Sequence, residues 1–441
     1  MNNISGAHVA TIPLNSEDQQ TSRATELVST HALEFRELLC ESIRFPSVSG
    51  SEGPFVHFIA TWARRMGFEV DLWQATEDSL QCYPQSKARH LALAGRPTAV
   101  IRLRGTSGGP SIGFNAHSDV VAAPEPERWS DHPWTGVTRE NRIFGRGACD
   151  TKGPLVSALL ALYAIRESRI PHRGDIFVEL IPGEEDCVGL GTLTSHVRGH
   201  VPDALIVLEP TESMPRYASR GGLRFEISCI GRSVHSTVKW AGVDAIDILR
   251  AVLDCLKEME TDSGKVDVHP LFAGYPIARP ITVDAVRGGQ WQGMVCDSSQ
   301  CTGYLELLPD DDLSAYQARF SDELHRRLAA RNRNPEHILI NFVETYTGHE
   351  IPLSNPLCHY ARRAVDATLA ASNSPREMSG FNSGCEAGLR ASLLGTPTIV
   401  WGPGSLMQAH CVDEYVCWSD VQAVAEMFVR TALAWTRGNH S

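Results

Sequence analysis

Five side chains of the types that bind divalent metal ions follow predicted strands or glycine-rich turns. They are two imidazoles and three carboxylates: His117, Asp150, Glu185, Glu209 and His410. Nitrogen and oxygen ligands suit zinc, and also cobalt or manganese. The set is larger than one tetrahedral ion needs, so we expect two divalent ions that share Asp150. Two such ions would together hold a hydroxide and polarise the carbonyl that it attacks.

Three further residues are candidates for the chemistry of such a site. Glu184 lies beside Glu185, and adjacent residues on a turn point in different directions, so Glu184 can face the water as general base and later protonate a leaving amine. Asp119 follows His117 by two residues and is predicted to hold the other ring nitrogen of that histidine. His235 is a candidate donor to the developing oxyanion.

Each of these features is weak when taken alone. A His-x-Asp pattern, two adjacent glutamates or a single histidine is usually structural or solvated, but their combination at successive strand ends favours a metal site. Four cysteines lie near the same stretches, so a thiolate ligand or nucleophile is an alternative, although buried small thiols are common. They are Cys149, Cys187, Cys385 and Cys411.

The order of predicted elements indicates how these residues are positioned. Strands alternate with helices over residues 31–217, which predicts an α/β catalytic domain with a mostly parallel sheet and helices on both faces. Candidate ligands then gather at the strand ends. Residues 218–347 follow the order β-α-β-β-α-β, which predicts an inserted α+β, ferredoxin-like domain. Residues 348–441 return to the catalytic domain, and residues 1–30 are expected to be a polar tail.

Composition excludes several classes of protein. A chain of 441 residues with 42% hydrophobic content predicts two globular domains. Its net charge of −12 argues against nucleic acid and anionic membranes as partners. No apolar run approaches the roughly 18 residues of a membrane span. The 12 cysteines form no CxxC pair, and the first residues lack the basic and apolar regions of a Sec signal, so we expect reduced thiols in a cytoplasmic protein.

Seven stretches of the chain resemble those of a known family. They are AHSDVV, RWSDHPWTG, GRGACDTKG, PGEED, LEPTE, GRSVHS and WGPGSLMQAHCVDEY. They are similar to the dinuclear-zinc, M20-type amidohydrolases and peptidases, which include acetylornithine deacetylase, succinyl-diaminopimelate desuccinylase, aminoacylase-1 and glutamate carboxypeptidase. The resemblance covers nearly all of the chain after about residue 31 and is specific because the stretches occur together.

The resemblance implies a role for each candidate residue. Asp150 would bridge two zinc ions, and the peptide bond from Asp150 to Thr151 would be cis. His117 and Glu209 would complete one metal site, and Glu185 and His410 the other. Glu184 would be the base and Asp119 the carboxylate that orients His117. His235 would reach the site across a homodimer interface built by the inserted domain, which would act as a lid.

The chain departs from the family pattern in two motifs. Gly293 and Cys296 stand where many members have the Asn and Pro of an N-x-(I/V)-P motif. Glu306 stands where the family has an Arg that binds the substrate carboxylate. A carboxylate substrate would then need another partner, for instance Arg220, Arg279 or Arg287, or the substrate is neutral or cationic on that side.

Together these observations predict a metal-dependent hydrolase that cleaves a C–N amide bond, that of an N-acyl amino acid or a related small amide. A dipeptidase or exopeptidase on the same scaffold is the first alternative. The second is a non-catalytic metal-binding relative, which the presence of all five ligands together with Glu184 and His235 disfavours.

Overall fold

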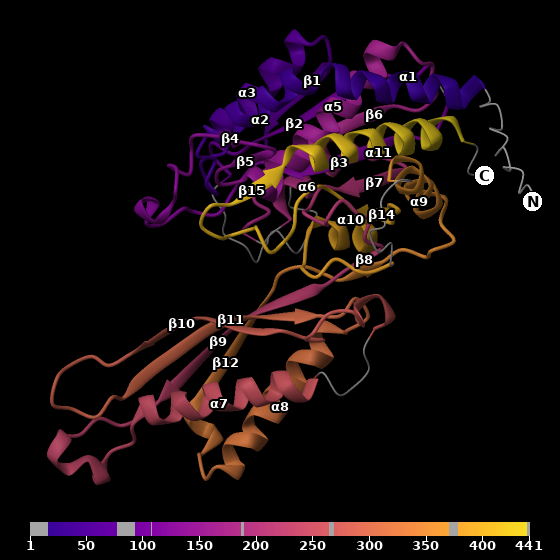
Figure 1. Cartoon of the computed structure of the whole chain (residues 1–441). Coiled ribbons are helices and arrows are strands. Elements are labelled where there is room, and N and C mark those ends of the chain that lie inside the picture. The colour runs from indigo at the N-terminus through magenta and orange to yellow at the C-terminus, as the bar shows by residue number, and fades with distance from the viewer. Residues whose placement is uncertain are drawn as a thin grey trace, which may run out of the picture.

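A six-stranded sheet forms the centre of the larger domain (Figure 1). The structure, a computed structural model, describes residues 16–76, 93–106, 108–186, 189–263, 269–369 and 378–438. In spatial order the strands are β1 Glu69–Gln74, β2 Pro97–Leu103, β6 Ile176–Ile181, β3 Ile112–His117, β7 Ala204–Val207 and β14 Thr398–Val400. Neighbours from β6 to β14 are parallel, whereas β2 is antiparallel to both β1 and β6. The prediction of a mostly parallel sheet is confirmed.

Helices cover both faces of this sheet, as predicted. One face carries α3 Gly53–Arg65, α5 Gly153–Ser168 and α11 Trp418–Arg437, with α2 Ala32–Ile43 and α9 Pro356–Thr368 packed around them. The other face carries α6 Leu190–Val197 and α10 Glu386–Leu394. Helix α5 is apolar around most of its circumference because it is buried between the sheet, α11 and α1, which explains the long apolar run at its sequence.

The N-terminal segment differs from the expected polar tail. Residues Ser16–Thr30 form helix α1, which packs against α5 and α11. Ala24 and Val28, one helical turn apart, are completely buried in the main core. The sequence pattern was misleading because so narrow an apolar stripe on a polar helix gives little periodic signal. Residues 1–15 of the expected tail lie outside the described residues.

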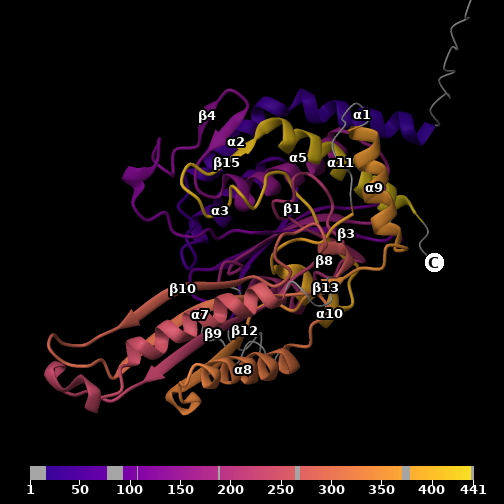
Figure 2. The same cartoon turned by 60° about the horizontal axis from the view of Figure 1, so that its bottom comes forward.

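The smaller domain has the predicted ferredoxin-like order. Its elements are β9 Gly221–Ile230, α7 Ala245–Ser263, β10 Ile281–Gly288, β11 Ser298–Leu307, α8 Leu313–Ala330 and β12 Ile338–Glu344. The strands form an antiparallel sheet in the order β10-β11-β9-β12. Both helices pack on one face, against a core that includes Leu223, Phe225 and Leu305. Figures 1 and 2 show this domain extending away from the larger one to a free end. We call it the lid.

Two small sheets join segments close to the candidate ligands. β8 Ala218–Ser219 pairs with β13 His349–Glu350, where the chain passes between the lid and the larger domain. β15 Tyr415–Cys417 pairs with β5 Arg142–Phe144, which in turn pairs with β4 Val137–Arg139. The β15–β5 pairing brings the stretch around His410 against the glycine-rich loop that precedes Asp150.

Candidate metal centre

The candidate ligands gather at one edge of the six-stranded sheet. His117 is the last residue of β3, while Glu184 and Glu185 follow β6 and Glu209 follows β7. These three strands are adjacent and parallel, so their carboxyl ends meet at the same edge. The predicted strand-end clustering is therefore present, because parallel pairing places residues from distant parts of the chain together.

Asp150 lies between the two candidate imidazole ligands. Its Oδ1 is 2.9 Å from His117 Nε2, and its Oδ2 is 3.4 Å from His410 Nε2. His410 Nε2 is also 3.2 Å from Glu185 Oε2. The Asp150–Thr151 peptide bond is cis, as the resemblance implies. One carboxylate with an imidazole near each oxygen has the arrangement expected of a ligand shared by two ions.

Two overlapping groups of ligand atoms describe the site. Possible ligand atoms of His117, Glu184 and Glu209 lie within 4.8 Å of one another, as do those of His117, Asp150 and Glu185. The structure thus brings all five predicted ligands and the predicted base into one cluster, since His410 contacts Asp150 and Glu185. Glu184 and Glu185 reach different members of this cluster although they are neighbours in the sequence.

The predicted contact between the Asp119 carboxylate and the ring of His117 is wrong in its details. His117 Nδ1 lies 2.8 Å from the backbone oxygen of Asp119, whereas the carboxylate oxygen is 3.8 Å away, beyond hydrogen-bond distance. The carboxylate instead accepts the backbone N–H groups of Gly183, Glu184 and Glu185, at 2.9, 3.2 and 3.0 Å. Asp119 therefore orients the ring through its carbonyl and holds the glutamate turn through its side chain.

The electrostatics of the cluster favour cations. Burial, opposed by His117 and reinforced by Glu185, raises the pKa of Glu184 well above its usual range. Burial and the neighbouring Glu184 raise the pKa of Glu209 in the same way. Hydrogen bonds to Asp150 and Glu185 raise the pKa of His410 to about 11. The raised pKa values mean that protons offset part of the negative charge of these closely spaced carboxylates. Bound divalent cations would replace those protons as the counter-charge.

Glu414 is a residue of the site that the sequence reasoning missed. Its carboxylate is completely buried and accepts the backbone N–H groups of Gly147, Cys149 and Asp150, at 3.0, 2.8 and 3.1 Å. It also accepts from Arg146 Nη1 at 2.7 Å. A single carboxylate thus binds three backbone N–H groups of the loop that carries Asp150. The only sequence signal was an acidic residue shortly after His410, in a stretch that also contains Asp413.

The thiols near the site do not have the properties of nucleophiles. Burial raises the pKa of Cys149 and of Cys385 well above the usual thiol range, so both are protonated at neutral pH. The Cys149 thiol donates to the backbone oxygen of Ser405, and the Cys411 thiol to that of Gln408. Cys187 lies outside the described residues.

His235 is not part of the cluster within the chain. It is exposed at the free end of the lid, where its Nδ1 accepts the backbone N–H of Thr237 at 3.3 Å. Figure 1 shows this end of the lid, beyond the start of α7, well away from the edge where β3, β6 and β7 end. In this arrangement of the two domains, His235 does not join the candidate ligands of its own chain.

Glu306 lies on β11, on the lid face opposite α7 and α8, and is partly buried. Burial, opposed by Arg220, raises its pKa to about 7. Two of the arginines considered as replacement anchors are already bound. Arg220 donates to Asn382 Oδ1 and to the backbone oxygen of Ala278, and Arg279 forms a two-point ion pair with Asp311 at 2.8 Å.

Comparisons with known proteins agree with this geometry. The model of Peptidase family M20/M25/M40 matches residues 113–434, and the chain belongs to this family. It is 24% identical to the acetylornithine deacetylase of Proteus mirabilis, over 89% of this chain and 94% of that protein. It is 23% identical to the N-formyl-4-amino-5-aminomethyl-2-methylpyrimidine deformylase of Bacillus subtilis, over 95% and 98%. The dipeptidase Dug1p of Saccharomyces cerevisiae has the same fold, with a TM-score of 0.75 at 14% identity, over 95% and 99% of the two chains.

The family assignment and the site define the class of protein. It is an enzyme, a metal-dependent hydrolase that acts on C–N amide bonds. Within the described part of the chain, no helix combines the length and apolar character that a membrane span needs.

Proposed function

We propose that this enzyme hydrolyses the amide bond of an N-acyl amino acid or a related small amide. The observation that carries the proposal is that two adjacent glutamates point to different parts of the site. Glu185 contacts His410, while Glu184 lies with His117 and Glu209. This arrangement leaves Glu184 beside the ligands and free to handle a proton. The names of the relatives, a deacetylase and a deformylase, support removal of a small acyl group.

The side chains fit two divalent ions, zinc by preference or cobalt or manganese. His117 and Glu209 would hold one, Glu185 and His410 the other, and Asp150 both. When bound, the ions act as Lewis acids on the amide carbonyl and lower the pKa of water. Glu184 accepts a proton from the attacking water at its carboxylate and delivers it to the departing nitrogen. Asp119 and Glu414 keep the backbone of the ligands in place.

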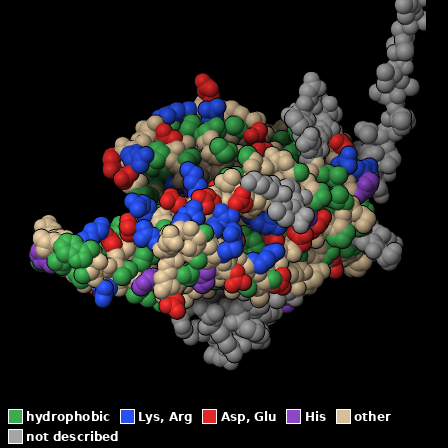
Figure 3. Space-filling view, turned by 90° about the horizontal axis from the view of Figure 1, so that it is seen from below, with side chains coloured by type: hydrophobic (Ala, Val, Ile, Leu, Met, Phe, Trp, Pro, Cys, Tyr) green, Lys and Arg blue, Asp and Glu red, His purple; other side chains and the backbone are tan. Residues whose placement is uncertain are grey.

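We further propose a homodimer formed through the lid, in which His235 serves the site of the partner. The free end of the lid exposes Trp240 and Trp291, at 82% and 80%. Figure 3 shows hydrophobic side chains gathered at this end. Exposed apolar surface of this kind marks interaction sites, and a second copy that covers it would bring His235 with it.

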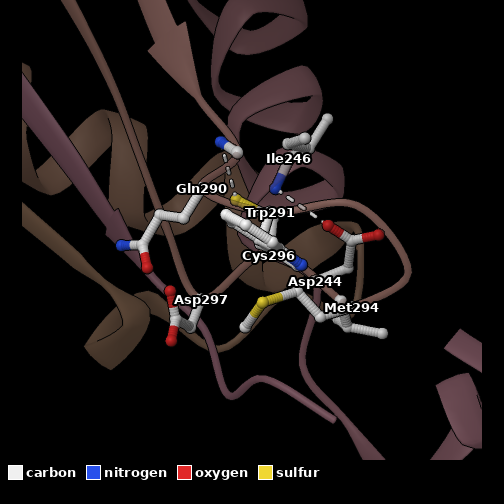
Figure 4. Close-up of a pocket in the computed structure, with 9 residues that line it drawn as sticks. Asp244, Ile246, Gln290, Trp291, Met294, Cys296 and Asp297 are labelled. Atoms are coloured by element: carbon white, nitrogen blue, oxygen red, sulfur yellow. Dashed lines mark hydrogen bonds between the residues drawn. The ribbon is translucent and has the colours of Figure 1, made fainter. Parts of the chain in front are cut away.

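The segment that carries Trp291 is joined to the segment that carries His235. Ser236 N–H donates to Gly293 O at 2.8 Å, and Val295 N–H donates to Val234 O at 2.9 Å. Trp291 and Cys296 line a cavity (Figure 4), whose volume is about 180 Å³. The Cys296 thiol accepts the backbone N–H of Gly289. Cys296, at the place of the family proline, therefore holds the turn that carries Trp291 through this hydrogen bond. Because this turn is bonded to the segment of His235, Trp291 and His235 would approach a partner chain together.

The location is proposed from the cysteines and the net charge. All ten cysteines within the described residues are free thiols, which supports a reducing compartment such as the cytoplasm. The charge of −12 supports a small-molecule substrate and no nucleic-acid or membrane partner.

The test is amide hydrolysis by the protein loaded with zinc or cobalt, with Glu184→Gln as the matched variant. The panel contains N-acetyl, N-succinyl and N-formyl compounds, dipeptides and neutral aromatic amides. We expect turnover of N-acyl compounds and its loss by several orders of magnitude in Glu184→Gln, with the bound metal retained. Turnover of dipeptides alone would favour the exopeptidase alternative, and equal loss of metal and activity would contradict the role of Glu184.

A further inference from the structure

The turn that carries Glu184 is fixed from two sides. On the side of the sheet, the Asp119 carboxylate accepts three successive backbone N–H groups of the turn, as described above. On the opposite side, the hydroxyl of Tyr346 donates to the backbone oxygen of Glu184. Asp119 accepts the N–H and Tyr346 donates to the carbonyl of the peptide group between Glu184 and Glu185, so this group is held at both of its ends.

Tyr346 belongs to the passage between the two domains. It lies between β12 of the lid and β13 of the larger domain, and it is buried. Its ring packs on Gly384, where an added Cβ would lie 2.7 Å from Tyr346 Cδ2. The tyrosine therefore lies between the glutamate turn and the segment that leads to α10, although it comes from the segment that connects to the lid.

The second passage between the domains is bonded to the first. Gly222 N–H donates to Tyr346 O at 2.9 Å, and Thr345 N–H donates to Gly222 O at 3.1 Å. The Thr345 hydroxyl lies 2.6 Å from the hydroxyl of Tyr304, on β11 of the lid. A continuous path of hydrogen bonds thus runs from the lid sheet through Tyr346 to the carbonyl of Glu184.

We propose that Tyr346 is a positioning residue through which the connection to the lid sets the orientation of Glu184. The inference rests on the proposed function in taking Glu184 as the base. Glu184 and Glu185 leave the backbone on either side of the peptide group whose carbonyl Tyr346 holds. The orientation of that group sets ψ of Glu184 and φ of Glu185, the backbone torsions beside the base and a candidate ligand, so a hydroxyl on its oxygen restrains both.

The experiment compares Tyr346→Phe with Tyr275→Phe. The control is matched, because the Tyr275 hydroxyl also donates to a backbone oxygen near the same passage, that of Gly380, at 2.8 Å. We expect the kcat of Tyr346→Phe to fall about tenfold, equivalent to about 1.4 kcal/mol, while KM and bound metal stay within about twofold of wild type. Tyr275→Phe should keep the wild-type kcat. An unchanged kcat in Tyr346→Phe, or an equal fall in both variants, would overturn the proposal.

A second readout separates this inference from the proposed function. Amide hydrogen exchange of the peptide that contains residues 183–186 should become faster in Tyr346→Phe and stay unchanged in Tyr275→Phe. Wild-type protein that hydrolyses no amide of the panel, but shows this pattern of exchange, would overturn the proposed substrate and support the role of Tyr346. Equal exchange in wild type and Tyr346→Phe would overturn the role of Tyr346 whatever the substrate.

Discussion

The carboxylate of Glu414 accepts the backbone N–H of Asp150 at 3.1 Å. The segment that carries the predicted ligand His410 therefore also holds the backbone of the predicted ligand Asp150. The same carboxylate forms a buried ion pair with Arg146. Neither residue is among the candidate ligands, yet the backbone position of Asp150, the ligand proposed to be shared, depends on them. The β15–β5 pairing places Glu414 beside the loop that carries Asp150.

Glu414→Gln should destabilise the protein and weaken metal binding. Removal of the Glu414 charge leaves Arg146 buried without its charged partner. In comparable buried pairs this lowers the free energy of unfolding by about 3–5 kcal/mol. Urea unfolding and metal titration measure the two effects. Glu125→Gln is the control, because Glu125 forms an ion pair of similar length with Arg128 at the surface, at 2.8 Å, and should leave stability unchanged. Equal effects of the two substitutions would contradict the structural role of Glu414.

Removal of metal by a chelator should abolish activity and lower the melting temperature. The buried carboxylates Asp150, Glu184 and Glu209 then lose their counter-charge, and the folded state loses the free energy of ion binding. Calorimetry before and after dialysis, followed by addition of zinc, cobalt or manganese, measures the loss and identifies the ion that restores activity. His117→Ala, which lacks a ligand, should respond less to the chelator. Full activity and an unchanged melting temperature without metal would exclude the proposed centre.

The stability of the protein should depend on pH through Glu306. Its pKa is raised to about 7 in the folded protein from the ordinary value of 4.5. The folded state therefore keeps a proton that the unfolded state releases, so this contribution is complete below the ordinary value and is lost as the pH rises through about 7. Between about pH 5 and pH 8, wild type should lose more free energy of unfolding than Glu306→Gln. Glu226→Gln, exposed on the adjacent strand β9, is the control and should follow wild type. Parallel curves for wild type and Glu306→Gln would contradict the prediction.

Glu306 should also influence which substrates are accepted. Glu306→Arg is expected to raise kcat/KM for N-acetyl amino acids relative to neutral amides, because it places a cation where the family resemblance implies an arginine that binds the substrate carboxylate. Steady-state kinetics on matched pairs of substrates, with and without a carboxylate, measure the change. An unchanged preference in Glu306→Ala would show that this position does not contact the substrate.

A mixture of two inactive variants should recover activity if His235 acts in the partner's site. In a mixed dimer of Glu184→Gln with His235→Ala, one site contains both an intact base and an intact histidine. Random exchange of subunits should then give about a quarter of wild-type activity. Denaturation and refolding of the mixture, with sedimentation to confirm the dimer, measures the recovery. Activity that stays at the level of the separate variants would argue that His235 does not act across an interface.

The residues that gather in the candidate centre could be singled out from the sequence because their signal is local. A histidine or carboxylate just after an apolar strand, beside glycine, is visible in a few residues of sequence, and the order of elements predicts which strand ends meet. The ferredoxin-like order of the lid follows from the same reasoning. Helix α5 appears in the sequence as a long apolar run because it is buried on most sides.

Only the tertiary structure decided which groups hold the ligands in place. The carboxylate of Asp119 binds the glutamate turn, although the nearest histidine in the sequence suggested a contact with the ring. Glu414 reaches the backbone of Asp150 across 264 residues, and Tyr346 reaches Glu184 across 162. Helix α1 packs through a narrow apolar stripe that includes Ala24 and Val28. Such contacts leave no periodic pattern, because each depends on how distant segments are brought together by sheet pairing and core packing, and not on the residues that surround it in the sequence.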